Sequence, residues 1–465
     1  MLATRRSKKS SPPPADAMIA SHPLADLFAL RLSAIWSALK SEHISFWAIC
    51  GYLIVEYVRP QSILPSLNVL PWAQTFILLS TLSWIADKNR RWVKDPANTW
   101  MSIFLLVLIL AGLTAYWPEI SRKYFMNFFG WFVIYFLIIN IVNNEKRFFI
   151  FLLIFLIASF KLAQFGARTW AMRGFSFTKW GLMGPEGFFQ NSGELAIQML
   201  VYTAISYQFA LAFRPWLSPL KYYLVQVGTL FGAMTILGSS TRGGQLGLAI
   251  ESYFTFLKGK LTLKTVLVVA LISCAGWLAL PAEQKDRISH AGEDDTSRQR
   301  LLYWKRGIEM IEQHPVLGIG YFNFPQYFEV HYPQDKLYKF AELPHNIFIQ
   351  VGTDAGLLGI FVYLMLIYRT FRTTKDIRKI VEKSPDCVVY ATLSRGFDTA
   401  FVGFLVAGQF VSVVYYPFMW VHLALVVSLK HLLLAKLDPQ STQQRPGAAH
   451  RIRSQTQSKA AATTL

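Results

Sequence analysis

Long apolar segments recur along most of this chain of 465 residues. A helix needs about 20 apolar residues to cross the hydrocarbon core of a bilayer. Because lipid satisfies no exposed backbone group, such segments form helices. The sequence therefore predicts an all-α integral membrane protein with about 12 transmembrane helices, in segments at about 44–58, 69–86, 99–117, 124–142, 148–165, 193–213, 220–239, 243–257, 264–281, 345–368, 396–414 and 416–435.

The composition and the placement of charge agree with this class. Hydrophobic residues make up 53% of the chain and charged residues 16%, whereas soluble domains carry about 25% charged residues. Lys and Arg gather in alternate loops, which places those loops and both termini in the cytoplasm. The net charge of +19 is thus a consequence of topology. We expect contacts with anionic membrane lipids and no nucleic-acid binding.

Three parts follow from this pattern. Residues 1–43 are expected to be a cytoplasmic N-terminal segment without a cleavable signal peptide, because they open with cations and prolines and lack an apolar core. Residues 44–435 are the membrane domain, and 436–465 a disordered cytoplasmic tail. Cys50, Cys274 and Cys387 have no metal-ligand spacing, so a disulfide framework is not expected.

A long loop at 282–344, before the tenth span, is predicted to be periplasmic and partly helical. Asp294 to Ser297 offer helix caps, apolar residues then recur at helical spacing through Gln313, and His314-Pro315 ends the helix. An apolar turn with Gly318 and Gly320 follows. A second outer segment, 166–192, carries Arg168 and Arg173.

Arg242 is the first candidate for chemistry. It lies in Ser239-Ser240-Thr241-Arg242-Gly243-Gly244, between the seventh and eighth spans, which could also form one re-entrant hairpin. An arginine near the bilayer needs an anionic partner or a route to water, and guanidinium groups bind phosphate oxygens in bidentate fashion. The alternative role is an interfacial anchor, or an ion pair with a carboxylate such as Glu194.

Other arginines lie on the same predicted side. Arg168 and Arg173 follow the fifth span, and Arg59 follows the first. Several guanidinium groups converging from different spans can hold a pyrophosphate. Ordinary loop charge is the alternative for each of them.

His345 is the candidate general base. It lies where the long outer loop meets the tenth span, in Pro344-His345-Asn346, and histidine titrates ordinarily near pH 6.5. A base is required if a sugar hydroxyl attacks the substrate. The alternative is a residue that only starts a helix. His290, His314 and His331 in the same loop weaken the signal.

Neither a metal nor a cofactor is expected. No paired Cys or His-x-x-x-His motif occurs, and Glu293-Asp294-Asp295 lies where helix caps are expected. No Gly-rich ATP loop occurs either. The energy for a reaction must then come from an activated substrate or a gradient.

Taken in order, these elements resemble the O-antigen ligase superfamily over roughly residues 44–435. The resemblance is carried by many spans, Ser240-Thr241-Arg242-Gly243, a late outer loop, His314-Pro315-Val316-Leu317-Gly318-Ile319-Gly320, and His345-Asn346 followed by Gly352, Gly356 and Gly359. It implies a GT-C-like, metal-independent glycosyltransferase of the bacterial inner membrane. Its active site would face the periplasm.

The resemblance further implies the substrates and the roles of residues. The donor is a glycan on undecaprenyl pyrophosphate, and the acceptor is lipid A-core, as in lipopolysaccharide assembly. His345 corresponds to the histidine that activates the acceptor, and Arg242 to an arginine on the pyrophosphate. Arg168 or Arg173 is the second arginine, Arg59 is a weaker candidate, and Asn346, Gly318 and Gly320 support the site.

Three alternatives remain open at this stage. An O-antigen polymerase and a protein O-oligosaccharyltransferase share the same motifs. A transporter or flippase for a lipid-linked glycan is a function of a different class. Transporters place polar, broken helices near the midplane and often contain repeated halves. Here the polar residues gather at the outer face and no repeat is evident, which favours an enzyme.

Overall fold

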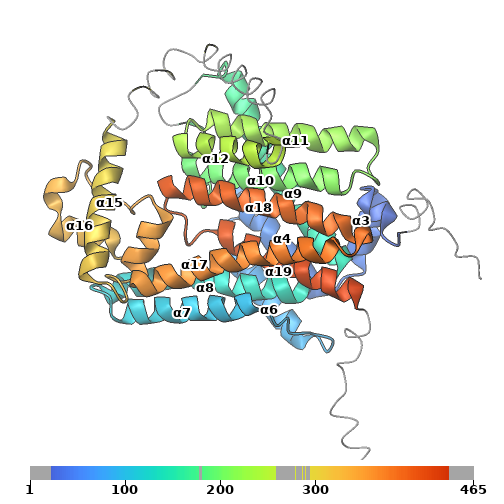
Figure 1. Cartoon of the computed structure of the whole chain (residues 1–465), viewed down its shortest axis with the longest axis horizontal. Helices are drawn as coiled ribbons and strands as arrows, with labels where there is room; N and C mark the ends of the chain where they lie inside the picture. Colours follow the sequence, from blue (N-terminus) through green and yellow to red (C-terminus); the bar gives the residue numbers. More distant parts are fainter. Residues whose placement is uncertain are drawn as a thin grey trace, which may run out of the picture.

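The computed structural model describes residues 22–176, 181–257 and 294–438, together with residues 278, 285 and 289. Every regular element in this part is a helix (Figure 1), which confirms the all-α prediction there. Seven helices are long and apolar enough to cross a membrane, while the total of twelve spans stays a prediction. The seven are α7 (Pro96–Leu113), α8 (Pro118–Ile141), α9 (Glu145–Met172), α10 (Ser192–Ala212), α11 (Pro219–Gly238), α17 (Ile347–Val381) and α19 (Pro417–Leu437).

Further helices complete the bundle. Two apolar ones match the first two predicted spans, and a third opens the eighth. The ninth predicted span, 264–281, falls outside the described residues except for residue 278. The remaining helices are α2 (Ala25–Phe28), α3 (Leu32–Lys40), α4 (Ile44–Tyr57), α5 (Pro60–Ile63), α6 (Trp72–Ala86), α12 (Arg242–Ser252), α15 (Asp295–Gln313), α16 (Phe324–His331) and α18 (Val388–Ala407).

The centre of the bundle is built on α10. This helix packs against α9, α11, α12, α18 and α19, and nearly all of its residues are buried. Small residues allow the close approach: Gly396 of α18 lies against Gln208, and Gly244 of α12 against Ala196. Polar side chains are also tied inside the bundle, as where the Gln198 amide donates to Ser159 Oγ at 3.0 Å.

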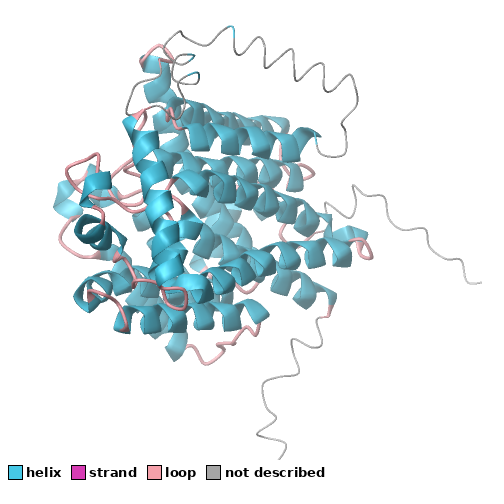
Figure 2. Cartoon of the chain, turned by 60° about the vertical axis from the view of Figure 1, so that its left-hand side comes forward, coloured by secondary structure: helices cyan, strands magenta, loops and turns pink. Residues whose placement is uncertain are grey.

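The helices run side by side, so the bundle has two ends. We call the end that carries α15 and α16 the outer end, and the other the inner end. Figures 1 and 2 show α15 lying across the ends of the bundle helices rather than along them. At the inner end, buried Asp95 caps α7 and accepts from Lys430 at 3.1 Å and His431 at 3.2 Å.

α15 confirms the helix predicted inside the long loop. Asp294 is its N-cap and Gln313 its last residue, as the cap residues and the His314-Pro315 stop indicated. The prediction was local, because capping groups and apolar spacing both act within a few turns.

Several boundaries differ from the predicted ones, and α18 begins at Val388 rather than at about 396. α9 extends to Met172, so Arg168 lies on a helix and not in an outer loop. α17 begins at Ile347, bends at Gly356, and continues to Val381. Its basic part, from Arg369 onward, is therefore an extension of the same helix.

Candidate active site

Arg242 is placed by a sharp corner at the outer end. α11 ends at Gly238, Ser240 takes a left-handed φ of 57°, and Arg242 is the first residue of α12. Ser239 Oγ lies 2.9 Å from Thr241 Oγ1 and fixes the corner. α12 then runs back alongside α10, so the guanidinium of Arg242 is left at the outer surface with 38% of its side chain exposed.

Asp294 is the partner of Arg242. The arginine Nη2 lies 2.5 Å from Asp294 Oδ2, and Asp294 also accepts from the Ser297 backbone N–H at 3.0 Å as the N-cap of α15. Partial burial opposes ionisation of this carboxyl. The hydrogen bonds from Arg242 and Ser297 outweigh it and lower the pKa of Asp294 to about 2. The pair fastens the start of α15 to the start of α12.

The suggested pairing of Arg242 with Glu194 is therefore wrong. Glu194 forms a capping box with Asn191 at the start of α10 and accepts from the Tyr416 hydroxyl at 2.8 Å. Its carboxylate is thus used to hold α10 against the segment before α19, and Arg242 takes its counter-ion from a residue 52 positions later in the chain.

Arg300 is a cation of this site that the sequence analysis missed. It lies on α15, one and a half turns after the Asp294 cap. Burial lowers the pKa of its guanidinium, and the nearby charge of Arg242 lowers it further, while Asp294 and Glu342 act in the opposite direction. Its Nε is buried and has no hydrogen-bond partner among the described residues. A half-buried guanidinium in this state can accept an anionic ligand.

His345 lies at the other side of the same loop system, with Glu342 as its partner. His345 Nε2 is 2.9 Å from Glu342 Oε2. This hydrogen bond is the main cause that lowers the pKa of Glu342, against the effect of its burial. If Glu342 accepts from Nε2–H, the lone pair of the imidazole lies on Nδ1. A carboxylate that orients a histidine in this way is a common arrangement for a general base.

The backbone around His345 is held tightly. His345 adopts a left-handed φ of 53°, a conformation that costs about 1–3 kcal/mol and persists only where its surroundings impose it. Its N–H donates to Ser412 Oγ at 2.7 Å. Asn346 then caps α17 by accepting from Phe348 N–H at 2.9 Å, and its amide donates to Gln409 Oε1 at 3.1 Å. Asn346 thus fixes the start of α17 directly after His345.

Packing links the two halves of the site. The Trp304 indole of α15 donates to the carbonyl of Pro344, next to His345, at 2.9 Å. The Trp304 ring also faces Phe410, with centroids 6.3 Å apart, and Phe410 lies against Gly243, next to Arg242. One helix, α15, therefore contacts both the Arg242 corner and the His345 loop, and it carries Arg300 between them.

Gly318 and Gly320 act by shaping the backbone. Gly318 (φ 67°) and Gly320 (φ 109°) adopt left-handed conformations that an L side chain rarely takes. Gly318 lies against the carbonyl of Thr353, and the Ile319 N–H donates to that carbonyl at 2.8 Å. The turn supports the bend of α17 at Gly356, where Leu357 N–H donates to the carbonyl of Pro315 at 2.7 Å.

Arg59 is a neighbour of the site and does not contact Arg242 or His345 directly. It follows α4 at the outer end, pairs with buried Glu56 at 3.4 Å and lies against Gly187. The same loop reaches the Arg242 corner, because Leu182 N–H donates to the carbonyl of Gly238 at 3.2 Å. Arg59 is thus one loop away from Arg242.

Arg168 and Arg173 are both exposed. Gly166 and Trp170 of α9 lie against Thr235 and Gly238 of α11, and residue 168 is half a turn from both. Arg168 therefore lies on the face of α9 away from the α11 corner. Arg173 caps the end of α9, closer to that corner. The structure brings neither arginine into contact with Arg242 or His345 in the part that it describes.

The remaining candidates have structural partners. His314 Nε2 lies 3.3 Å from the Tyr116 hydroxyl, and His331 stacks on Tyr327 at 4.1 Å. His290 and Glu293 are outside the described residues. Within the described ranges, no group of three His, Cys, Asp or Glu side chains is arranged to hold a metal ion.

The comparisons with known proteins point to one region of the chain. Residues 227–364 match the family model described as O-antigen ligase. This range contains Arg242, Arg300 and His345, and it excludes Arg59, Arg168 and Arg173. No curated protein matches the chain.

Proposed function

Because this chain belongs to the O-antigen ligase superfamily, we propose that it moves a glycan from undecaprenyl pyrophosphate to an acceptor hydroxyl. The acceptor that we propose is lipid A-core, in lipopolysaccharide assembly at the bacterial inner membrane, with the outer end of the bundle in the periplasm. One observation carries the proposal: α15 joins Arg242 and Arg300 to the loop of the His345–Glu342 pair.

The arginines serve the donor. A pyrophosphate needs several positive charges, and it gains negative charge as the bond to the sugar breaks. Arg242 keeps a 38% exposed side chain while it holds Asp294, and Arg300 carries a buried N–H without a partner in the described part. Both groups can donate to phosphate oxygens. Their contribution would be electrostatic stabilisation of the leaving group.

His345 serves the acceptor. The acceptor oxygen attacks the anomeric carbon, the carbon–oxygen bond to the pyrophosphate breaks, and undecaprenyl pyrophosphate leaves with the bonding electrons. The hydroxyl proton passes to Nδ1 of His345 and then to water. Glu342 holds the opposite nitrogen of the ring at 2.9 Å, and it stabilises the imidazolium that forms.

The positions of the charged groups agree with arginines that bind the donor and a histidine that activates the acceptor. Arg242 and Arg300 gather on the side of the α11–α12 corner, and His345 lies at the start of α17. A donor phosphate and an acceptor hydroxyl can then approach from different sides of α15. An O-antigen polymerase or a protein O-oligosaccharyltransferase would use the same groups with another acceptor.

A transporter of lipid-linked glycans is the competing function from another class. Transport requires no general base, so the Glu342–His345 pair would have no role in it. The bend of α17 at Gly356 does resemble the broken helices of transporters. That bend, however, is filled by the turn of Pro315 to Gly318, which supports a fixed scaffold.

The test is a reaction with purified protein, undecaprenyl-pyrophosphate-linked glycan and lipid A-core, in excess EDTA and without ATP. We expect transfer to lipid A-core. Transfer to a second glycan or to a protein would identify another branch of the superfamily. An absence of transfer to all three acceptors, with donor movement across vesicles instead, would contradict the enzyme proposal.

A further inference from the structure

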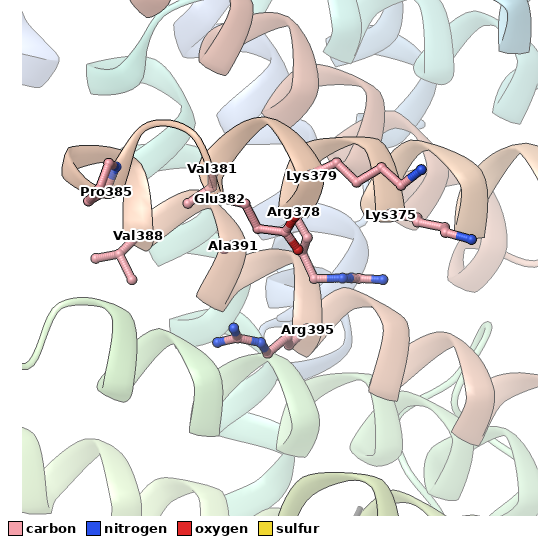
Figure 3. Close-up of a pocket in the computed structure, with 9 residues that line it drawn as sticks. All are labelled: Lys375, Arg378, Lys379, Val381, Glu382, Pro385, Val388, Ala391 and Arg395. Carbon is pink, nitrogen blue, oxygen red and sulfur yellow. The ribbon is translucent and has the colours of Figure 1, made fainter. Parts of the chain in front are cut away.

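The basic extension of α17 has no part in the proposed reaction, because it lies at the inner end of the bundle. It forms a hairpin with α18, and a hollow of about 500 Å³ lies in this hairpin. Its lining includes Lys375, Lys379 and Arg395 (Figure 3). We propose that this hollow binds the phosphate-bearing headgroup of an anionic phospholipid.

The hairpin itself is rigidly joined, so the hollow does not depend on Lys375, Lys379 or Arg395. Arg378 pairs with Asp398 at 2.7 Å across the two helices. Thr374 donates to the other oxygen of the same carboxylate at 2.5 Å. Tyr390 of α18 donates to Glu145 at the start of α9. The hollow is therefore a feature of the folded bundle.

The charge around the hollow is largely uncompensated. Among the described residues, Lys375, Lys379 and Arg395 form no ion pair with a carboxylate, and all three side chains are exposed. Glu382 is the one carboxylate in the lining. In Figure 3 the amines of Lys375 and Lys379 point to one side, whereas the guanidinium of Arg395, on the neighbouring helix, points to the other side. Such an arrangement attracts an anion.

The apolar part of the lining favours a lipid over a free anion. Val381 and Ala391 form a buried surface beside the cations, and Val388 is 56% exposed. A free phosphate gains nothing from the exposed Val388 side chain, whereas the glycerol and upper acyl chain of a lipid can cover it. The charges and the apolar surface together match the two parts of a phospholipid.

The hollow also lies at the depth where headgroups are expected. Gly396, next to Arg395, lies against Gln208 near the inner end of α10. The apolar helices of the bundle end at this level, at Ala212 of α10 and Ile141 of α8. Lys375 and Lys379 are one turn apart on the face of α17 that borders the hollow. A lipid in the adjoining leaflet can reach them without leaving the membrane.

The test is lipid binding by delipidated protein in detergent, measured by native mass spectrometry. Phosphatidylglycerol and phosphatidylcholine are compared, with inorganic phosphate as a third arm. The variant removes three cations at once, as Lys375→Ala, Lys379→Ala and Arg395→Gln, and leaves Arg378 in place. A cation near an anionic headgroup is worth about fivefold in affinity. We therefore expect roughly a hundredfold weaker binding of phosphatidylglycerol.

Two controls make the result specific. The matched variant carries Lys88→Ala, Arg91→Gln and Lys94→Ala, three exposed cations in another loop of the inner end, and should bind within about threefold of the unaltered protein. A charge-conserving variant, with Lys375→Arg, Lys379→Arg and Arg395→Lys, should retain binding and shows that the hairpin tolerates substitution.

Three results would overturn the proposal. The first is unchanged binding in the triple variant when its thermal unfolding is also unchanged. The second is an equal loss in the matched control, which would indicate general surface charge. The third is full competition by inorganic phosphate at the lipid concentration, which would indicate a simple phosphate site.

Discussion

Replacing Glu342 by Ala isolates the partner of the proposed base. The carboxylate contacts the imidazole of His345 at 2.9 Å. Hydrogen bonds to charged groups are worth about 1.5–3 kcal/mol, but the Glu342 side chain is 65% exposed, and solvent screens such pairs. We therefore expect a loss of about 1 kcal/mol in transition-state stabilisation. This corresponds to a roughly fivefold slower transfer.

The effect should depend on His345. Only the side chain of Glu342 makes this contact, while its backbone N–H donates to the Tyr303 hydroxyl oxygen at 2.9 Å in either case. The Glu342→Ala protein should thus fold and bind donor normally. In a His345→Ala background, the same substitution should change the rate by less than about twofold, because its partner is already absent.

The assay is single-turnover transfer in membranes at matched expression, with donor binding measured on the same samples. A fivefold loss in both backgrounds would show that Glu342 acts independently of His345. A loss as large as general-base removal, about 10²–10⁴, would indicate that Glu342 itself takes the proton. Either result would refute the arrangement proposed for the pair.

Other parts of the site give further predictions. Arg242→Ala and Arg300→Gln should each weaken donor binding and slow transfer by about 10²–10³, with poor rescue by Lys at either position; normal donor affinity in titrations would exclude pyrophosphate binding by that residue. Cysteine at position 297 should react with an impermeant thiol reagent added outside cells and cysteine at 379 should not, and labelling of 379 would invert the topology. Because the folded-state pKa of Asp294 is lowered to about 2, its stabilising effect is fully present above its unfolded pKa of about 3.9 and is lost as pH falls toward 2. The melting difference between the unaltered protein and Asp294→Asn should therefore be constant from pH 5 to 8 and shrink below about 4; a difference that varies between pH 5 and 8 would argue against this pair.

Local signals in the sequence located much of the fold. α15 follows from the Asp294 cap, the apolar spacing and the His314-Pro315 stop, all of which act over a few residues. The apolar segments likewise indicated helices, since length and hydropathy are properties of the segment itself. The described helices lie close to the expected segments for the same reason.

Features that depend on distant contacts were not predictable in this way. The bend of α17 exists because the turn at Gly318 packs against Thr353 and replaces a helical hydrogen bond near Gly356. No residue near Gly356 in the sequence indicates that packing. The sequence offered Glu194 as one possible partner of Arg242 and not Asp294, because Asp294 approaches Arg242 only through the placement of α15.

Arg300 shows how a functional signal can be hidden by a structural one. It lies within the helix whose apolar residues indicated packing, and a charge on such a helix is ordinarily part of its solvated face. Its position, about one turn before Trp304, which contacts the His345 loop, becomes informative only in the folded chain. The role of Glu342 as the partner of His345 was easier to predict. It is three residues before His345, and this spacing could have suggested the contact.

His345 is the centre of the proposed mechanism, and its replacement by Ala is the most direct test. Donor binding and transfer should be measured on the same membranes at matched expression. We predict transfer slowed by about 10²–10⁴, with donor binding unchanged because the arginines remain. Transfer at a near-unaltered rate would show that His345 only begins a helix, and would contradict the assignment of this residue as the base.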